Sequence, residues 1–280
     1  MPSIKTAIGI KVREKLGIQP YCIGRNLTVF PDDVFLVSYP KSGSTWIRFL
    51  IGNLLYPDIN ITFASIQNII PDIYLTSDRQ LLQLSRPRII KSHEYFDPRY
   101  KKIILIVRNP YDITISSYFH FLKYGLITQE TSLAEFGTNF ITGKYHFVGE
   151  SNPLGTWAEN INSWLGTKEE NVNFLLLRYE DFKTKPVEQL DKIASFLAFE
   201  CSQTVIDRAI KNSSIQRMRK LEQQQKNVWP AKYTKQDIAF VRSATSGEGL
   251  DKLPPSVIRQ IEGCWGKTIE QLGYSKQAVE

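Results

Sequence analysis

The chain has 280 residues, of which 42% are hydrophobic and 22% are charged. This composition excludes intrinsic disorder and a coiled-coil rod, and it is enough to bury a large core as one big domain or two modest ones. With 35 basic and 28 acidic residues the net charge is +7, which favours an anionic partner: a phosphate-bearing small molecule, nucleic acid or an acidic membrane surface.

The cysteines and histidines exclude several kinds of site. The three cysteines are Cys22, Cys201 and Cys264. They are far apart and form no CxxC pair, so we expect neither a disulfide framework nor a zinc ribbon, and we expect a reducing compartment such as the cytoplasm. None of the three histidines has the HExxH spacing, and no acidic cluster resembles a calcium loop. We therefore expect no tightly bound metal.

The first predicted element is a short basic amphipathic helix. Its apolar positions recur at i, i+4 intervals among lysines and arginines: Ile4, Ile8, Val12 and Leu16. We expect this helix to pack on the domain, and contact with an anionic membrane surface is the alternative. The segment lacks the apolar run of a signal peptide, and no later stretch is long and apolar enough to span a membrane.

Short strands and helices alternate through the rest of the chain. The predicted strands are 34–39, 88–93, 101–109 and 173–179, and the predicted helices include 44–55, 111–124, 186–199 and 255–272. The strands are apolar on both faces, which is typical of a parallel sheet covered by helices on each side. The sequence therefore predicts an α/β fold with a central, mainly parallel sheet, in one three-layer domain that spans 1–280 with its core at about 30–275.

Two stretches lack this pattern. Residues 125–155 mix glycine, threonine and aromatic residues, and we interpret them as irregular cover over the sheet. Residues 211–254 are polar and basic, and the run 222–226 has no apolar face to bury. The second stretch is therefore a candidate for a lid that orders when a ligand binds.

The first strand and helix are joined by a turn suited to phosphate, in the run VFLVSYPKSGSTWIRFLI. Pro40 ends the strand, Gly43 permits a left-handed backbone, and Ser44 and Thr45 supply caps for the helix. Backbone N–H groups then converge on one point, and Lys41 adds a full charge there. The lysine precedes the glycine, so this is not the nucleoside-triphosphate loop GxxxxGK[ST]; a capped turn without function is the alternative.

The next two strands end in charged residues. Lys91 and His93, in RPRIIKSHEYF, are two apart and point the same way, so a cation and a base meet at the carboxyl edge of the sheet. The strand in KKIILIVRNPYDITISSYFHF ends in Arg108, where a kinase would carry an aspartate to hold magnesium. A guanidinium clamps a phosphate without metal. A structural histidine and a surface arginine are the alternatives.

These runs resemble motifs of the cytosolic-type sulfotransferases, and the resemblance spans about Val34 to Tyr274. PKSGSTW is similar to the phosphosulfate-binding loop YPKSGTTW, with Ser44 as the only departure, KSH resembles the KTH motif, and RNPYDITIS is similar to RNPxDxxxS. LLLRYEDF resembles LxYEDM, and the stretch Ser213, Ser214, Ile215 and Met218 follows TSFxxM. FVRSATSGEG resembles FxRKGxxGDW, but Ser243 and Ala244 stand where a lysine and a glycine are usual.

The resemblance implies an enzyme that moves a sulfuryl group from 3′-phosphoadenosine 5′-phosphosulfate (PAPS) to a hydroxyl or amine. It implies that His93 takes the acceptor's proton, that Lys41 stabilises charge on the leaving phosphate oxygen, and that Lys91 assists at the sulfuryl oxygens. Glu94 is a second candidate base, since some carbohydrate sulfotransferases use a glutamate. A P-loop kinase and a catalytically silent nucleotide-binding protein are the alternatives.

The resemblance also implies the cofactor contacts. Arg108, Ser116 and Arg242 would hold the 3′-phosphate, and Trp46 and Tyr179 would hold the adenine. His120 stands where the family usually has an aromatic, too far along its helix to disturb the grip on the 3′-phosphate. The implied cofactor-binding set is Lys41, Ser42, Gly43, Ser44, Thr45, Trp46, Arg108, Ser116, Tyr179, Ser213, Ile215, Met218, Arg242, Ser243 and Ala244.

The acceptor is expected to be a small molecule or a lipid headgroup rather than nucleic acid. Aromatic residues that suggest a partly apolar acceptor are Phe63, Tyr74, Phe119, Phe121, Tyr145 and Phe147. The protein is expected to be a monomer or a homodimer, since one stretch loosely resembles the family's dimer motif KxxxTVxxxE through Lys252, Ser256, Val257 and Glu262.

Overall fold

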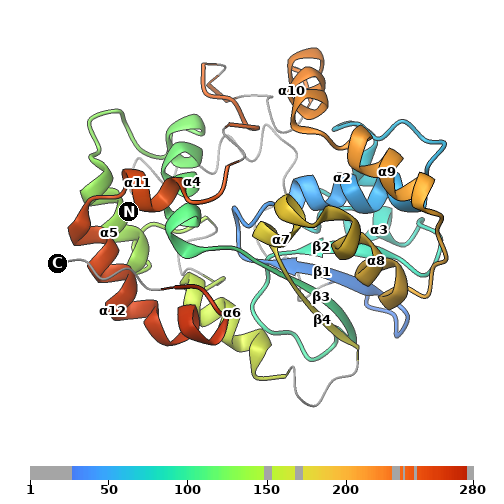
Figure 1. The fold of residues 1–280 in the computed structure, drawn as a ribbon, viewed down its shortest axis with the longest axis horizontal. Coiled ribbons are helices and arrows are strands. Elements are labelled where there is room, and N and C mark those ends of the chain that lie inside the picture. The colour runs from blue at the N-terminus through green and yellow to red at the C-terminus, as the bar shows by residue number, and fades with distance from the viewer. Residues whose placement is uncertain are drawn as a thin grey trace.

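A computed structural model describes residues 27–147, 153–167, 173–228, 234–235, 237–242 and 245–275. Within this part of the chain four strands form one sheet: β1 (Val34–Ser38), β2 (Ile89–Ser92), β3 (Lys102–Val107) and β4 (Phe174–Arg178). Their order across the sheet is β2-β1-β3-β4, and every pair is parallel (Figure 1). The predicted helix around Ile4–Leu16 lies outside the described residues.

Helices cover both faces of the sheet, because the strands alternate their side chains between two cores. Val34, Leu36 and Ile104 pack in one core, under α2 (Ser44–Leu55), α8 (Pro186–Phe196) and α9 (Gln203–Asn212). Phe35, Val37 and Ile103 pack in the other. That second core lies under α4 (Pro110–Lys123), α5 (Leu133–Ile141), α6 (Trp157–Leu165) and α12 (Pro255–Gln271) (Figure 1). The predicted three-layer α/β class is confirmed.

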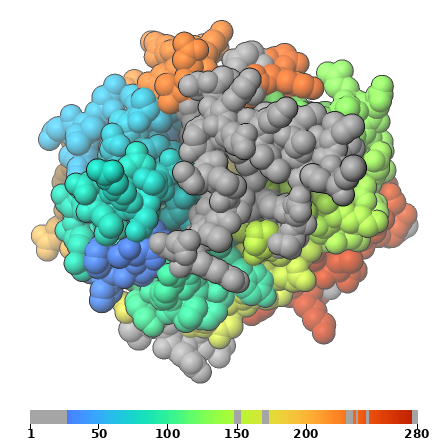
Figure 2. All heavy atoms as spheres, turned by 180° about the vertical axis from the view of Figure 1, so that it is seen from behind, coloured from blue at the N-terminus to red at the C-terminus, as the bar shows by residue number. Residues whose placement is uncertain are grey.

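Shorter elements fill the connections between these layers. They are the 3₁₀ turn η1 (Ile66–Asn68) and the helices α3 (Asp78–Leu81), α7 (Tyr179–Thr184), α10 (Ile215–Gln224) and α11 (Glu248–Lys252). From behind, the elements up to about residue 100 occupy one side of the molecule, and α4 to α6 with the C-terminal helices occupy the other (Figure 2). α10 lies at one end of the molecule, above α2 and α9 in Figure 1.

One prediction about an irregular segment is wrong in part, and the polar stretch contains a helix that was not predicted, while its role as a lid stays a prediction. Residues 125–155 contain α5, which buries Phe136 and Phe140 in the core below it. The polar stretch 211–254 contains α10, which buries Met218 and Leu221 and ends at Gln224. Both helices form because a few apolar residues at helical spacing are buried by tertiary contacts, in spite of polar neighbours.

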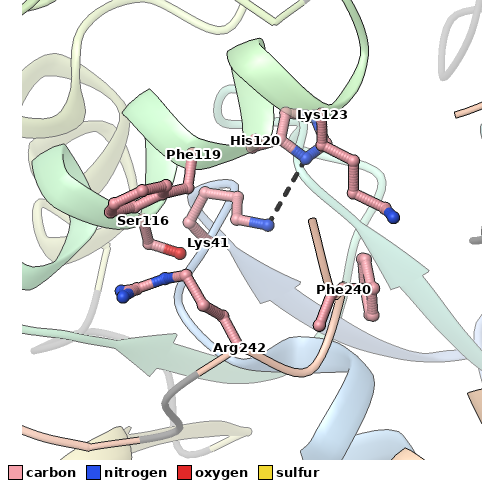
Figure 3. Close-up of a pocket in the computed structure, with 8 residues that line it drawn as sticks. Lys41, Ser116, Phe119, His120, Lys123, Phe240 and Arg242 are labelled. Atoms are coloured by element: carbon pink, nitrogen blue, oxygen red, sulfur yellow. Dashed lines mark hydrogen bonds between the residues drawn. The ribbon is translucent and has the colours of Figure 1, made fainter. Parts of the chain in front are cut away.

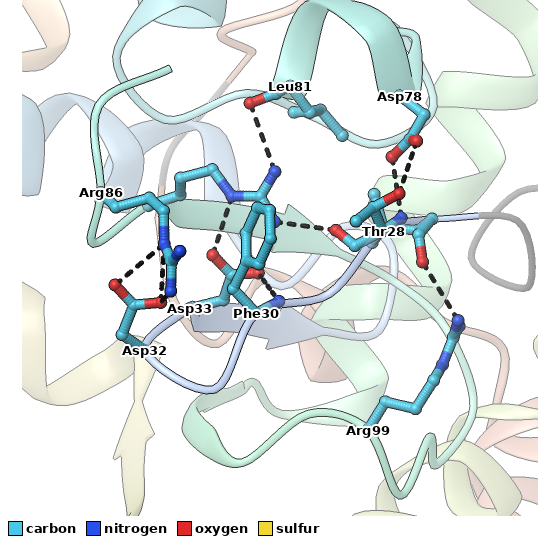
Figure 4. Close-up of polar contacts among 10 residues, drawn as sticks. Thr28, Phe30, Asp32, Asp33, Asp78, Leu81, Arg86 and Arg99 are labelled. Atoms are coloured by element: carbon cyan, nitrogen blue, oxygen red, sulfur yellow. Dashed lines mark hydrogen bonds and ion pairs between the residues drawn. The ribbon is translucent and has the colours of Figure 1, made fainter. Parts of the chain in front are cut away.

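A cluster of polar contacts fixes the chain just before β1 (Figure 4). The side chain of Asp33 accepts from Arg88 Nε at 2.8 Å, and both side chains are fully buried. Arg88 also donates to the carbonyl of Thr28 at 2.8 Å, and Thr28 Oγ1 donates to Asp78 at 2.8 Å. These contacts tie the start of β1 to β2 and α3, so the strand that leads into the predicted phosphate turn is held at its other end.

None of the helices in the described ranges is long and apolar enough to cross a membrane. The residues of the loose dimer motif have partners within the chain. Lys252 pairs with Glu248 at 2.7 Å, Glu262 accepts from the Tyr111 hydroxyl at 2.7 Å, and Val257 is fully buried. The oligomeric state stays a prediction.

Candidate active site

The turn between β1 and α2 has the backbone that the sequence predicts for a phosphate site. Lys41 and Gly43 are both left-handed, with φ of 72° and 85°. A Cβ atom at position 43 would lie 2.4 Å from Cδ2 of Tyr179, so only glycine fits between the turn and that ring. Gly43 offers α2 no side-chain cap, and the first N–H groups of a helix have no acceptor within it. The start of α2 therefore presents free donors to an anion.

Two further donors at this turn are buried and unpaired. Ser42 Oγ and Arg108 Nε have no hydrogen-bond partner among the described residues. A buried polar group without a partner is costly, and such groups in native proteins usually serve a ligand or water. The residues present at this turn thus fit a phosphate group, which would accept from both.

Lys41 brings an ammonium into this cluster of donors. Burial, and then the nearby cations led by Arg108 and Arg242, lower the pKa of Lys41 to about 7. In the described part of the chain Lys41 has no carboxylate partner; its ammonium contacts His120 Nδ1 at 3.4 Å and lies 5.2 Å from the centre of the Phe240 ring. A bound anion would therefore be its first negative neighbour.

The two arginines assigned to the 3′-phosphate come from different segments, Arg108 from the end of β3 and Arg242 from the segment before α11. Arg108 donates to the carbonyls of Lys41 and Thr245, each at 3.1 Å, and its guanidinium lies 4.4 Å from the centre of the Tyr179 ring. Arg242 lies over the Phe119 ring at 4.4 Å and pairs with both carboxylate oxygens of Glu248. Ser243 and Ala244, which follow Arg242, lie outside the described residues.

The residues assigned to the adenine meet behind the turn. The rings of Trp46 and Tyr179 are 5.6 Å apart at an angle of 71°, and Trp46 Nε1 donates to the carbonyl of Ser213 at 2.8 Å. Met218 is buried in a small core that Trp46 also packs against. Ile215 begins α10 two residues after Ser213. The structure therefore brings most of this predicted set together.

His93 lies just beyond the end of β2, beside the end of β1. Its Nδ1 contacts the carbonyl oxygen of Ser38, and a carbonyl only accepts, so Nδ1 carries the proton. Nε2 is then the free acceptor of the ring. Burial, and then the charge of Lys91, lower the pKa of His93 to about 3, so the imidazole is neutral at physiological pH.

Lys91 has a partner that the sequence prediction missed. Its Nζ lies 2.8 Å from Oδ2 of Asp72, and both side chains are almost fully buried. Burial lowers the pKa of Lys91 to about 8, against the opposing effect of Asp72. Burial acts to raise the pKa of Asp72, but Lys91 and Arg48 outweigh it and hold that pKa below its usual value. A single acid in the apolar run IIPDIYL was the signal available, because a buried charge needs a partner.

A small pocket opens over Lys41 (Figure 3). Ser116, Phe119 and His120 line it from α4, together with Lys123 at the end of that helix, and Phe240 and Arg242 line it from the segment before α11. The prediction placed Ser116 and Arg242 here, but it gave no role to His120 or Lys123. The spacing of Ser116 and His120, four residues apart on a predicted helix, was the signal, because such residues share a face.

Four of the six aromatic residues predicted for the acceptor divide into two groups. Phe119 lines the pocket, and the Tyr74 ring lies 5.7 Å from the ring of His93. Phe63 and Phe121, by contrast, are buried in separate cores. Within the described residues no group of three or more histidine, cysteine, aspartate or glutamate side chains is placed to hold a metal ion.

A parallel α/β sheet with a donor-rich turn at its carboxyl edge is the architecture of many nucleotide- and phosphate-binding proteins. Within that class, the sequence model of the sulfotransferase domain matches residues 31–273. The chain belongs to the sulfotransferase family. The predicted family and the predicted sulfotransferase activity are therefore confirmed.

Individual relatives agree with the family match. The chain is 29% identical to sulfotransferase 1E1 of Bos taurus over 235 residues, which cover 78% of this chain and 77% of that protein. It is 28% identical to sulfotransferase 2A6 of Rattus norvegicus, over 78% of this chain and 77% of that one. The crystal structure of mouse sulfotransferase SULT7A1 complexed with PAP (adenosine 3′,5′-bisphosphate) superposes with a TM-score of 0.68 and 25% identity. The match covers 87% of this chain and 85% of that chain.

Proposed function

We propose that this sulfotransferase takes the sulfuryl group of PAPS and transfers it to a hydroxyl or amine group of a small molecule. The family match and a solved relative complexed with PAP support PAPS as the donor. The observation that carries the proposal is the cluster of unpaired donors around a single ammonium at the β1–α2 turn, with the base His93 at the next strand end.

His93 acts as the general base in the proposed reaction. Because Nδ1 is held by the carbonyl of Ser38, Nε2 offers its lone pair to the acceptor's proton. The ring is neutral at physiological pH, so its lone pair is available, but a pKa of about 3 also makes it a weak base in the ligand-free protein. Glu94, the second candidate, accepts a hydrogen bond from the Tyr74 hydroxyl at 2.9 Å, which leaves its carboxylate less free to act.

Lys41 stabilises the charge that develops on the leaving phosphate oxygen. Its ammonium is preorganised in a buried site, where such an interaction is stronger than in water. Lys91 adds positive charge near Lys41, but the Lys91 ammonium is already paired with Asp72. We therefore assign Lys91 a weaker part in the reaction than Lys41.

Arg108, Ser116 and Arg242 read the 3′-phosphate of the nucleotide. Ser116 and Arg242 line the pocket beside Lys41, and Arg108 donates to the Lys41 carbonyl and keeps an unpaired Nε for a phosphate oxygen. A P-loop kinase would need an acidic magnesium ligand at a strand end, but β3 is followed by Arg108. The family match also disfavours the kinase and the silent nucleotide-binding protein.

The proposal is tested by the melting temperature with adenosine 3′,5′-bisphosphate (PAP) and with AMP. A ligand that binds only the native state stabilises it by mass action, so PAP should raise the melting temperature and AMP should raise it much less. Arg108→Ala should remove most of the difference between the two ligands. Equal shifts with PAP and AMP in the wild type would contradict the assigned 3′-phosphate site.

A further inference from the structure

We propose that His120 is a positioning residue for Lys41. Its imidazole accepts a hydrogen bond from the lysine in the ligand-free protein, and this hydrogen bond breaks when the nucleotide binds. The inference rests on the proposed role of Lys41. It assigns a function to His120, which stands where the family usually has an aromatic residue.

The two side chains meet in the pocket above the phosphate turn (Figure 3). His120 lies one turn beyond Ser116 on α4, and its Nδ1 is 3.4 Å from Lys41 Nζ. The ring is held from the side by Tyr124, at 4.4 Å between ring centres, and by Phe147, at 5.5 Å. These aromatic contacts fix the direction in which the imidazole faces the lysine.

The chemistry of the two groups fixes the direction of the hydrogen bond. When Lys41 is protonated its ammonium only donates, so Nδ1 of His120 is then the acceptor and the ring proton lies on Nε2. Burial, and then the charge of Lys41, lower the pKa of His120 well below its usual value, so the ring stays neutral and keeps its lone pair. His93 on the other side has the opposite tautomer, with its proton on Nδ1.

In the part of the chain that the structure describes, the charged groups that shift the pKa of Lys41 are all cations. Arg108 comes from the end of β3, Lys91 from β2, Lys123 from α4 and Arg242 from the segment before α11. All four oppose the protonated form of Lys41. In the described part of the chain, the lone pair of His120 is the one hydrogen-bond acceptor that favours it.

This arrangement has a consequence for nucleotide binding. When Lys41 turns to an anionic ligand it must leave His120, so the imidazole opposes binding wherever Lys41 is already protonated in the free protein. Without the imidazole acceptor, the pKa of Lys41 in the free protein is lower. At low pH the nucleotide then binds more tightly, because the hydrogen bond between Lys41 and His120 no longer has to be broken. At pH values where the free lysine is already neutral, the acceptor has no such effect.

The experiment is a titration of PAP against the wild type and His120→Phe by calorimetry, from pH 5.5 to 8.5. The ratio of the two affinities cancels the titration of the ligand itself. We expect the ratio to be close to one at pH 8.5 and to favour His120→Phe by about three- to tenfold at pH 5.5. His120→Gln, which keeps an acceptor oxygen, should follow the wild type. Tyr118→Phe removes a hydroxyl from the same helix outside the pocket and should also follow it.

Two results would overturn the inference. A ratio that stays at one throughout the pH range would mean that the contact has no effect on Lys41. Weaker binding by His120→Phe at every pH would mean that the imidazole contacts the ligand directly. If His120→Phe does not fold, His120→Leu takes its place, with melting temperature as the check. Failure of the wild type to bind PAP would contradict the proposed function itself.

Discussion

At the scale of single residues, the proposed chemistry depends most on His93. His93→Ala should lower turnover by about 10²- to 10⁴-fold, the usual cost of losing a general base. It should leave the affinity for PAP nearly unchanged, because the nucleotide is assigned to other side chains. Initial rates with radiolabelled PAPS and a panel of phenols and alcohols measure the first effect, and calorimetry with PAP measures the second.

Glu94→Gln is the matched control for this base. The substitution keeps the shape of the side chain and an oxygen for the Tyr74 hydroxyl, so turnover should fall by less than about tenfold. If Glu94→Gln abolished turnover and His93→Ala did not, the base would be the glutamate. If neither variant changed the rate, His93 would have only a structural role.

Sequence reasoning reached some of these residues and missed others for physical reasons. Lys41, His93 and Arg108 all follow buried strands, and parallel strands bring such positions to one edge wherever the loops run. Asp72 and His120 act through partners far away in the chain, Lys91 and Lys41. A partner across the fold leaves little trace in local sequence, so their roles appear only in three dimensions.

At the scale of elements, the prediction succeeded where apolar residues dominate a segment. All four strands and the helix α2 appear within about two residues of the predicted bounds. α5 was missed because its buried Phe136 and Phe140 stand among glycine and threonine, which favour loops. α10 was missed because only Met218 and Leu221 of its ten residues are buried. In both helices tertiary packing outweighs local preference.

The contact between α11 and α4 gives a prediction at this scale. A Cβ atom at Gly249 would lie 2.2 Å from the backbone of Tyr111, and the Gly249 amide donates to Asp112 at 2.8 Å. Gly249→Ala should therefore lower the free energy of unfolding by about 1–3 kcal/mol. It should also weaken PAP binding, because α11 carries Glu248, the partner of Arg242.

Gly263→Ala on α12 is the matched control, measured by the same urea unfolding curves. Apart from its own helix backbone, a Cβ at this exposed helical position would meet no described atom within 4 Å. Alanine should raise the free energy of unfolding by about 0.5–1 kcal/mol, because it restricts the unfolded chain more than glycine does. Equal effects of the two substitutions would contradict the close packing of α11 on α4.

At the scale of the whole molecule, the concentration of cations at one edge of the sheet makes stability depend on pH. The pKa of Lys41 is about 7 in the folded protein and about 10.4 in an unfolded chain. Between these values the unfolded state binds more protons, so the free energy of unfolding should rise as the pH increases from 7 to 9. Lys91, whose folded pKa is about 8, adds to the same trend.

Urea unfolding at pH 7, 8 and 9 tests this dependence. Lys41→Met should flatten the rise, because the neutral side chain has no proton to lose. Saturating PAP should flatten it too, since a bound anion keeps the lysine protonated in the folded state. A wild-type curve that falls between pH 7 and 9 would contradict the assigned environment of Lys41.

The unpaired donors of the phosphate turn also bear on how this protein would evolve in the laboratory. Ser42 Oγ and Arg108 Nε weaken the ligand-free fold, because buried polar groups without partners are costly. A selection for heat resistance alone would favour an apolar side chain at position 42, and it would thereby discard one proposed contact to the nucleotide. A screen that keeps the nucleotide present during heating would retain both residues. The choice of selection conditions therefore decides whether a more heat-resistant variant keeps its enzyme activity.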